Sequence, residues 1–160
     1  MVASLPTRLS AARQRGVTLI ELVVVISVLA VLASLAGPSM SRLIASQRVK
    51  TTASDLHLAL MKARSEAIKR NVSITVEPST GTNWSSGWSV KNGATVLDAN
   101  AAPTAATITP SATTAAVVYR YDGRSTTAVQ FVVSATSSTV SRCVSIDSTG
   151  RPYTKEGTSC

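Results

Sequence analysis

The sequence predicts an α+β fold in which one long N-terminal α-helix packs on an antiparallel β domain. Three observations support this prediction. A long apolar run follows a short basic N-terminal segment, a second segment repeats apolar residues at helical spacing, and the rest of the chain alternates short β-rich stretches with turn residues. The helix is expected to be transmembrane in its first half and amphipathic in its second. About 120 of the residues lie beyond the membrane segment, enough for one small domain.

The N-terminal segment and the apolar run predict a single membrane crossing. Residues 1–16 are polar and basic and lack the apolar core of a secretory signal peptide. Residues 17–37 match the length that crosses a bilayer, and Glu21 is the only charge among them. The positive-inside rule places the N-terminus in the cytoplasm and the remainder outside it. A plain signal anchor would explain these features but not Glu21, because a charge at bilayer depth costs roughly 2.5–3.5 kcal/mol.

The junction Gly16-Val17-Thr18-Leu19-Ile20-Glu21 resembles the prepilin peptidase site of the type IV pilin superfamily. The resemblance implies cleavage between Gly16 and Val17 by prepilin peptidase, which removes leader 1–16, and N-methylation of Val17. The first residue is usually Phe in this family, and Val17 departs from that pattern. The resemblance also implies that Glu21 pairs with the free amine of a neighbouring pilin or pseudopilin subunit. A buried carboxylate needs a cation, and cleavage creates one at Val17; pairing within one chain or between chains is equally compatible with the sequence.

The second half of the predicted helix follows Gly37-Pro38. Proline removes one backbone N–H and clashes with the preceding turn, so Pro38 is expected to kink or end the helix. In pilins a proline near this position marks a bend or a stretch that melts on assembly; alternatively, Pro38 marks only the membrane exit. Residues 38–71 are predicted to form an amphipathic helix that packs on the β domain. Its apolar stripe has the spacing of one helix face: Val49, Ala53, Leu56, Leu60, Ala63 and Ala67.

Residues 63–71, with the sequence ARSEAIKRN, narrow the resemblance. They are similar to the stretch that closes the helix in the pseudopilin H and FimT/FimU minor-pilin group. This resemblance implies a pilin-like lollipop, with a helical stem and a β domain of residues 72–160. It covers residues 17–71 closely and the C-terminal half only in outline.

The β domain is predicted from alternation and turn residues. Strands are expected at residues 72–76, 87–90, 115–121, 127–133 and 139–146, and turns at Asn92-Gly93, Asp122-Gly123 and Thr149-Gly150. Residues 80–86 are expected to form a polar loop, and residues 98–107 a mobile one. Trp84 and Trp88 could form an exposed contact patch, although tryptophan near a strand start is more often buried in the core.

Two cysteines, Cys143 and Cys160, are expected to form a disulfide, because an exported domain meets oxidising conditions. The alternative is two free thiols. The sequence offers no Cys/His cluster with metal-ligand spacing, so no metal or cofactor is expected. The single histidine, His57, follows Asp55 by two residues and therefore does not face it on a helix. Without paired carboxylates, a catalytic triad or a Gly-rich phosphate loop, the sequence favours a structural protein over an enzyme.

The formal net charge is +8. Arg8, Arg13 and Arg15 contribute three of these charges, so +5 remains once the leader is removed. A basic exported domain can reflect ordinary solubility or attraction to polyanions.

The C-terminal region raises the second possibility. Some FimT-type minor pilins bind DNA during natural transformation through a C-terminal Gly-Arg-any-Arg motif. Gly150-Arg151-Pro152-Tyr153 matches its first half and lacks the second arginine. Other residues could complete a basic patch, with one aromatic ring to stack on a base: Arg142, Lys155, Arg124 and Tyr153. Alternatively, Gly150-Arg151 is a hairpin turn with a solvated arginine.

The sequence therefore predicts a structural subunit in the inner membrane. The protein is expected to cross the membrane once, with a periplasmic C-terminal domain, and to enter a type IV pilus or a type II secretion pseudopilus. DNA uptake is the alternative function. The sequence does not decide between the pilus and the secretion system.

Overall fold

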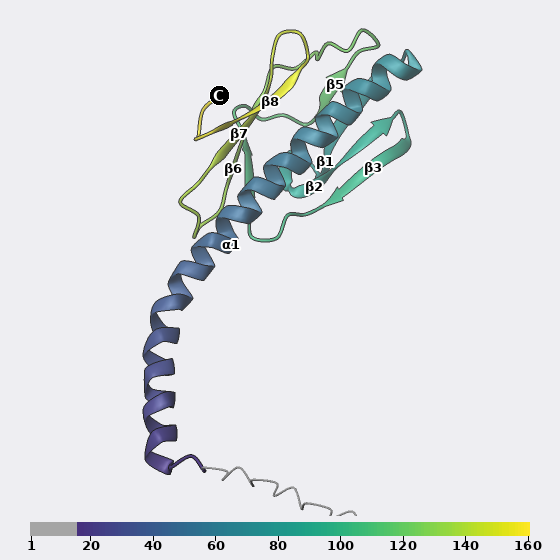
Figure 1. Ribbon diagram of the computed structural model, residues 1–160. Helices are drawn as coiled ribbons and strands as arrows, with labels where there is room; N and C mark the ends of the chain where they lie inside the picture. Colours follow the sequence, from purple (N-terminus) through teal and green to yellow (C-terminus); the bar gives the residue numbers. More distant parts are fainter. Residues whose placement is uncertain (1–15) are drawn as a thin grey trace, which may run out of the picture. The chain divides into compact units, whose positions relative to one another are not determined.

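The computed structural model describes residues 16–160, apart from the side chains of residues 35–38. Within this range it contains helix α1 (Leu19–Arg70), followed by eight β-strands (Figure 1). The chain divides into two compact units, which meet in sequence at Gly37 and Pro38. A long N-terminal helix packed on antiparallel sheets confirms the predicted fold class. The predicted leader lies outside the described residues, except for Gly16.

Helix α1 is continuous through Pro38, so this proline does not end the helix. A proline removes one i→i−4 hydrogen bond, and the remaining bonds of a long helix can hold its neighbours in helical geometry. The helix ends at Arg70, and Asn71 adopts a left-handed φ of 54°. Val72 N donates to Ala67 O at 3.3 Å, as expected after a left-handed C-terminal residue.

The first sheet has the order β3-β2-β1-β5 and is antiparallel. Its strands are β1 (Ile74–Thr80), β2 (Asn83–Asn92), β3 (Thr95–Ala101) and β5 (Val117–Tyr119). Asn92-Gly93 forms the predicted turn between β2 and β3, with Gly93 at a φ of 56°.

Two loop predictions in this sheet are wrong. Residues 83–86 belong to β2 rather than to a polar loop, and residues 98–101 belong to β3 rather than to a mobile loop. Asp98, Ala99 and Asn100 have low strand propensity, but pairing with β2 satisfies their backbone groups. Gly87 allows this approach, because a Cβ there would lie 2.4 Å from Asn100 O.

The second sheet has the order β4-β6-β7-β8 and is also antiparallel. Its strands are β4 (Thr107–Pro110), β6 (Gln130–Ser134), β7 (Arg142–Ile146) and β8 (Pro152–Glu156). Strands β5, β6 and β7 lie within or overlap the predicted strands 115–121, 127–133 and 139–146. Strands β4 and β8 were not predicted, because β4 is short and β8 begins with a proline and ends with charged residues.

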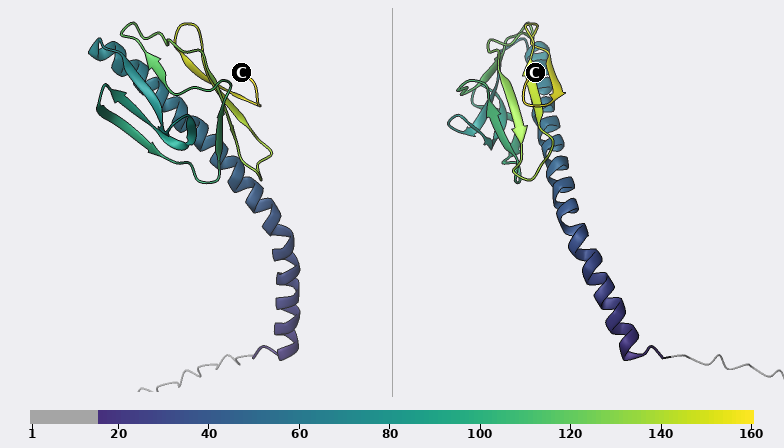
Figure 2. Two further views of the ribbon diagram at one scale, coloured as in Figure 1. Left: turned by 180° about the vertical axis from the view of Figure 1, so that it is seen from behind. Right: turned by 90° about the vertical axis from the view of Figure 1, so that its left-hand side faces the viewer.

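The core lies between the two sheets and the buried side of α1 from Val49 to Ala67. The views in Figure 2 show this part of α1 running along the strands of both sheets. Trp84 and Trp88 are 0% and 2% exposed, which confirms that they belong to the core. Trp84 Nε1 donates to Thr114 O at 2.9 Å, and its ring centroid lies 4.6 Å from that of Phe131. Trp84 on β2 and Phe131 on β6 thereby join the two sheets.

Candidate assembly and binding sites

The start of α1 is fixed by Thr18. Its Oγ1 accepts a hydrogen bond from Glu21 N at 3.3 Å, and its carbonyl accepts one from Leu22 N at 3.2 Å. Thr18 is therefore the N-cap, and Glu21 stands three residues later, the spacing of a capping box. Sequence analysis missed this role, although the Thr-x-x-Glu spacing was a visible signal. The Gly16–Val17 peptide bond, the predicted cleavage site, consequently lies before the first helical residue and is exposed.

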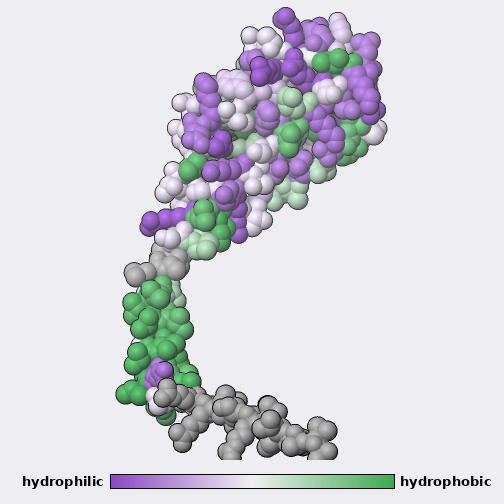
Figure 3. Space-filling model, in the orientation of Figure 1, coloured by the Kyte–Doolittle hydropathy of each residue, from purple (hydrophilic) through white to green (hydrophobic). Residues whose placement is uncertain are grey.

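The first half of α1 presents an apolar surface to its surroundings. The described side chains of residues 19–34 are all exposed, and Figure 3 shows an almost continuous hydrophobic surface along this stretch. By length and composition, α1 is the one helix in residues 16–160 that could cross a membrane. A surface of this kind indicates contact with lipid or with other apolar helices.

Glu21 is the one charged residue on this surface. Its carboxylate forms no ion pair among the described residues. Its place in the first turn is favourable, because the helix N-terminus carries partial positive charge. A cation that pairs with this carboxylate would therefore be a group other than the described side chains.

Cys143 and Cys160 form a disulfide with a Cα–Cα distance of 5.6 Å, as predicted. Cys143 lies on β7 and is fully buried. The bond ties the last residue of the chain to the second sheet. Lys155 Nζ donates to Cys160 O at 2.9 Å and so holds the same tail from β8.

The register of β7 and β8 separates the predicted basic residues. Arg142 pairs with Glu156, and Cys143 pairs with Lys155. Directly paired residues share one face of a sheet, and successive residues alternate between faces. Lys155 and Tyr153 therefore lie on one face, whereas Arg142 lies on the other. Arg142 Nη2 donates to Glu156 Oε1 at 2.6 Å.

Arg151 follows a tight turn between β7 and β8. Asp147 Oδ1 accepts hydrogen bonds from Thr149 N at 2.8 Å, Thr149 Oγ1 at 2.6 Å and Arg151 N at 2.9 Å. The Thr149 hydroxyl, followed by the Arg151 amide, holds the pKa of the Asp147 carboxyl below its usual range. Gly150 and Arg151 thus lie in a hairpin turn, and the Arg151 side chain is exposed.

Gly150 and Gly123 bring a second loop against this turn. Gly150 has a φ of 82°, and a Cβ on it would lie 2.2 Å from Gly123 O. Arg64 of α1 joins both segments, with Nε donating to Gly123 O at 3.0 Å and Nη2 to Thr149 O at 3.4 Å. Arg124 therefore lies next to the turn that presents Arg151. Sequence analysis missed Arg64, and its place in the 63–71 segment was the only signal.

The same loop carries an exposed aromatic ring. The Arg120 guanidinium lies 5.7 Å from the centroid of the Tyr121 ring, and both residues are exposed. Tyr119 is fully buried, and burial raises the pKa of its phenol well above the usual range. Tyr119 is therefore neutral and belongs to the core, whereas Tyr121 is available at the surface.

The described residues contain no group of His, Cys, Asp and Glu side chains that could hold a metal ion. His57 Nε2 lies 3.2 Å from Pro152 O and, since a carbonyl only accepts, donates to it. This contact ties α1 to the start of β8. His57 therefore has a packing role.

Comparison with known families and structures gives consistent results. The sequence matches the family described as type II transport protein GspH over residues 52–150. It also matches the prokaryotic N-terminal methylation motif over residues 11–37. No protein of curated function matches the chain.

The fold is similar to two crystal structures of the type IV minor pilin FimU of Pseudomonas aeruginosa. The structure in space group P21 has a TM-score of 0.61 and 21% identity, covering 71% of this chain and 96% of that one. The structure in space group P65 has a TM-score of 0.61 and 22% identity, covering 69% of this chain and 98% of that one. At these identities the similarity supports the fold alone.

Proposed function

Because the chain belongs to the GspH family of type II transport proteins, a family of structural subunits rather than enzymes, we propose that it is a pilus or pseudopilus subunit. The observation that carries this proposal is the exposed apolar first half of α1 with Glu21 in its first turn. The apolar side chains of such a helix are removed from water only when lipid or neighbouring helices cover them. The subunit therefore has two environments, the inner membrane before assembly and the filament after it.

Processing precedes assembly in this proposal. Prepilin peptidase cleaves the exposed bond between Gly16 and Val17, and Val17 is then N-methylated. The methylation motif at residues 11–37 and the non-helical backbone before Leu19 support this step. Mass spectrometry of the purified protein should find a chain that begins at Val17 and carries one extra methyl group. A mature chain that retains residues 1–16 would contradict the step.

Glu21 sets the axial position of the subunit in the filament. The Val17 amine, once formed, is a cation of the kind that a carboxylate in an apolar helix bundle requires. We assign this pairing to neighbouring subunits, because an ion pair between subunits fixes the position of one helix along the next.

The test replaces Glu21 by Gln, which keeps the size of the side chain and removes its charge. Membrane insertion should remain, whereas the amount of subunit in purified filaments should fall at least tenfold, since a desolvated unpaired cation costs several kcal/mol. Asp55→Asn is the matched control, because Asp55 is an exposed carboxylate on the same helix. Normal incorporation of Glu21→Gln would overturn the role of Glu21.

The phenotype of a gene deletion distinguishes between the two filament types. Deletion of the gene should abolish surface pili if the subunit belongs to a type IV pilus. It should instead abolish export of secreted enzymes if the subunit belongs to a type II secretion pseudopilus. Loss of neither would contradict the structural proposal.

DNA binding is a second candidate function, supported by one arrangement. Tyr153 and Lys155 share a face of β8, Arg151 precedes them in the same alternation, and Arg124 lies beside the turn. An aromatic ring among cations can bind single-stranded nucleic acid through stacking and phosphate contacts. Arg142 is not part of this arrangement.

The test is a DNA titration of the full chain in detergent at several salt concentrations. Arg151→Ala and Lys155→Ala should each reduce the slope of log affinity against log salt by about 1 if they contact phosphates. Arg142→Ala, on the opposite face of the sheet, should leave the slope unchanged. Binding that is absent or independent of salt would exclude this function.

A further inference from the structure

The beginning of the second compact unit carries an exposed set of apolar and basic side chains on α1. Met40, Leu43 and Ile44 are 57%, 55% and 45% exposed. Three exposed cations lie among and after them. We call these six residues the basal face: Met40, Arg42, Leu43, Ile44, Arg48 and Lys50.

The helical periodicity places five of the six members around one side of α1, whereas Arg42 precedes Ala45 by three residues and Val49 by seven and so shares their side. Ala45 and Val49 are 8% and 0% exposed and mark the side that faces the β domain. With 3.6 residues per turn, Met40, Leu43 and Ile44 point away from Ala45 and Val49, and Leu43 and Ile44 also line a groove that residues 100–104 of the β domain border.

Arg48 and Lys50 flank the apolar members, one on each side of the helix. An apolar stripe with cations on its flanks is typical of helices at a membrane–water interface, where long basic side chains reach the headgroups.

The charged residues of this region are all basic. After Glu21 the next acidic residue is Asp55, so Arg42, Arg48 and Lys50 have no acidic neighbour in sequence. Among the described residues, none of these three cations forms an ion pair. In contrast, Lys62 and Lys91 of the same unit are paired with carboxylates. The basal face is thus complementary to an anionic partner.

We propose that the basal face binds the headgroup layer of an anionic phospholipid membrane before assembly. This inference rests on the proposed insertion of residues 17–37 into the membrane. Met40–Ile44 follow Ala36 by four to eight residues in the sequence, so the basal face begins next to the segment proposed to cross the membrane. Apolar side chains enter the headgroup layer, and each nearby cation is attracted to anionic lipid by about fivefold in affinity.

This contact would hold the β domain close to the membrane surface and would be lost when the subunit leaves the bilayer. The lipid composition of the membrane would then affect how readily the subunit is extracted. A protein partner at the same face would instead give an effect independent of lipid charge.

The experiment uses the full chain in vesicles of phosphatidylcholine, with or without phosphatidylglycerol. A fluorophore is attached to Gln47→Cys, at the centre of the basal side of α1, and the native cysteines remain in their disulfide. Quenching by a headgroup-labelled lipid reports the fraction of domains at the membrane surface. Flotation of the vesicles reports insertion separately.

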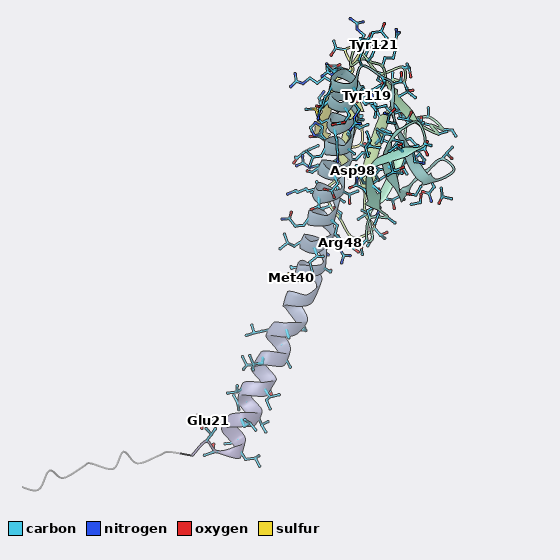
Figure 4. All side chains as sticks on the ribbon, turned by 90° about the vertical axis from the view of Figure 1, so that its right-hand side faces the viewer. Glu21, Met40, Arg48, Asp98, Tyr119 and Tyr121 are labelled. Carbon is cyan, nitrogen blue, oxygen red and sulfur yellow. A yellow bond between two sulfur atoms is a disulfide. The ribbon has the colours of Figure 1, made fainter. Side chains whose placement is uncertain are left out.

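Quenching should be stronger in vesicles with phosphatidylglycerol and should weaken with salt. The triple variant Arg42→Gln/Arg48→Gln/Lys50→Gln should lower the docked-to-undocked ratio at least about tenfold. The control is Lys69→Gln/Lys91→Gln/Arg120→Gln, which changes the charge equally and should leave the ratio unchanged. Arg120 neighbours Tyr121, which lies toward the opposite end of this unit from Arg48 (Figure 4).

The outcomes separate the two proposals. Failure to float would overturn the insertion on which this inference rests. Flotation with quenching that is equal in both lipids, or equal in both triple variants, would overturn the membrane-binding role. Quenching that depends on the protein-to-lipid ratio would show that another copy of the chain occupies the basal face, and would also overturn it.

Discussion

The two compact units differ in how far they bury their apolar side chains. In the unit Pro38–Cys160, Trp84, Phe131 and Leu56 are fully buried by the chain itself. In the preceding segment, Val25 and Leu29 are 50% and 57% exposed. Fully burying such a side chain gains about 1.5–3 kcal/mol, so the second unit gains this energy on folding, whereas the first half of α1 gains it only from lipid or from other subunits. One unit is therefore specified by its own packing and the other by its surroundings.

The sharpest test of this contrast compares Trp84→Ala with Leu29→Ala. Trp84→Ala should destabilise the β domain by about 3–5 kcal/mol, because it empties the junction between the sheets and leaves Thr114 O without its donor. Leu29→Ala should change domain stability by less than about 0.5 kcal/mol. Urea unfolding of the full chain in detergent, followed by tryptophan fluorescence, measures both. Equal losses of stability from the two substitutions would contradict the difference between the two units.

Removing the disulfide tests how much the attached C-terminal tail stabilises the β domain. Cys160→Ser should lower stability by about 3 kcal/mol, since the Cys143–Cys160 bond closes a loop with a sequence separation of 17. Insertion into vesicles should not change. The same urea experiment gives the stability, and dithiothreitol treatment of the natural chain should reproduce the loss. No loss in either case would show that the tail does not contribute to folding.

Gly150→Ala tests the contact between the two turns. The substitution should cost about 2–3 kcal/mol, because the left-handed φ disfavours a side chain and the Cβ would meet Gly123 O. Gly93→Ala is the matched control, with a φ of 56° and open space around the Cβ. It should cost only about 1 kcal/mol. Similar losses at both positions would mean that close packing at Gly150 contributes little.

The smallest expected effect concerns Asp147. Its pKa is lowered in the folded chain, so it binds fewer protons than in the unfolded chain. Its stabilising effect is therefore complete above the unfolded pKa of about 3.9 and is lost as the pH falls through the lower folded pKa. Asp147→Asn should reduce stability at pH 7, and its difference from the natural chain should shrink below about pH 4. Unfolding experiments on both chains across this pH range measure the difference.

The strands show where sequence patterns stop being sufficient. Residues 72–76 alternate clearly and predict a strand, and Asn92-Gly93 predicts a turn. Residues 98–101 lack strand propensity, and residues 152–156 begin with a proline and end with charged residues. The first segment becomes part of β3 and the second becomes β8 because neighbouring strands satisfy their backbone groups. Hydrogen bonding between strands is a tertiary property that local composition does not contain.

The binding residues show the same division. Sequence could identify Arg151, Lys155 and Arg142 as cations, but only the register of β7 and β8 places Arg142 on the other face. The role of Arg64 also depends on two turns that are distant in sequence and meet only in the folded chain.

What the sequence by itself determined is the helical unit: the apolar run, its length and the single carboxylate follow from local composition, because membrane spanning is a property of one segment. The disulfide was also predictable, since the chain has only two cysteines. Only the tertiary structure decided the order of the strands, the burial of Trp84 against Phe131 and the separation of Arg142 from Lys155. These features depend on contacts between distant segments, and the energy of such contacts is defined only when both partners are in place.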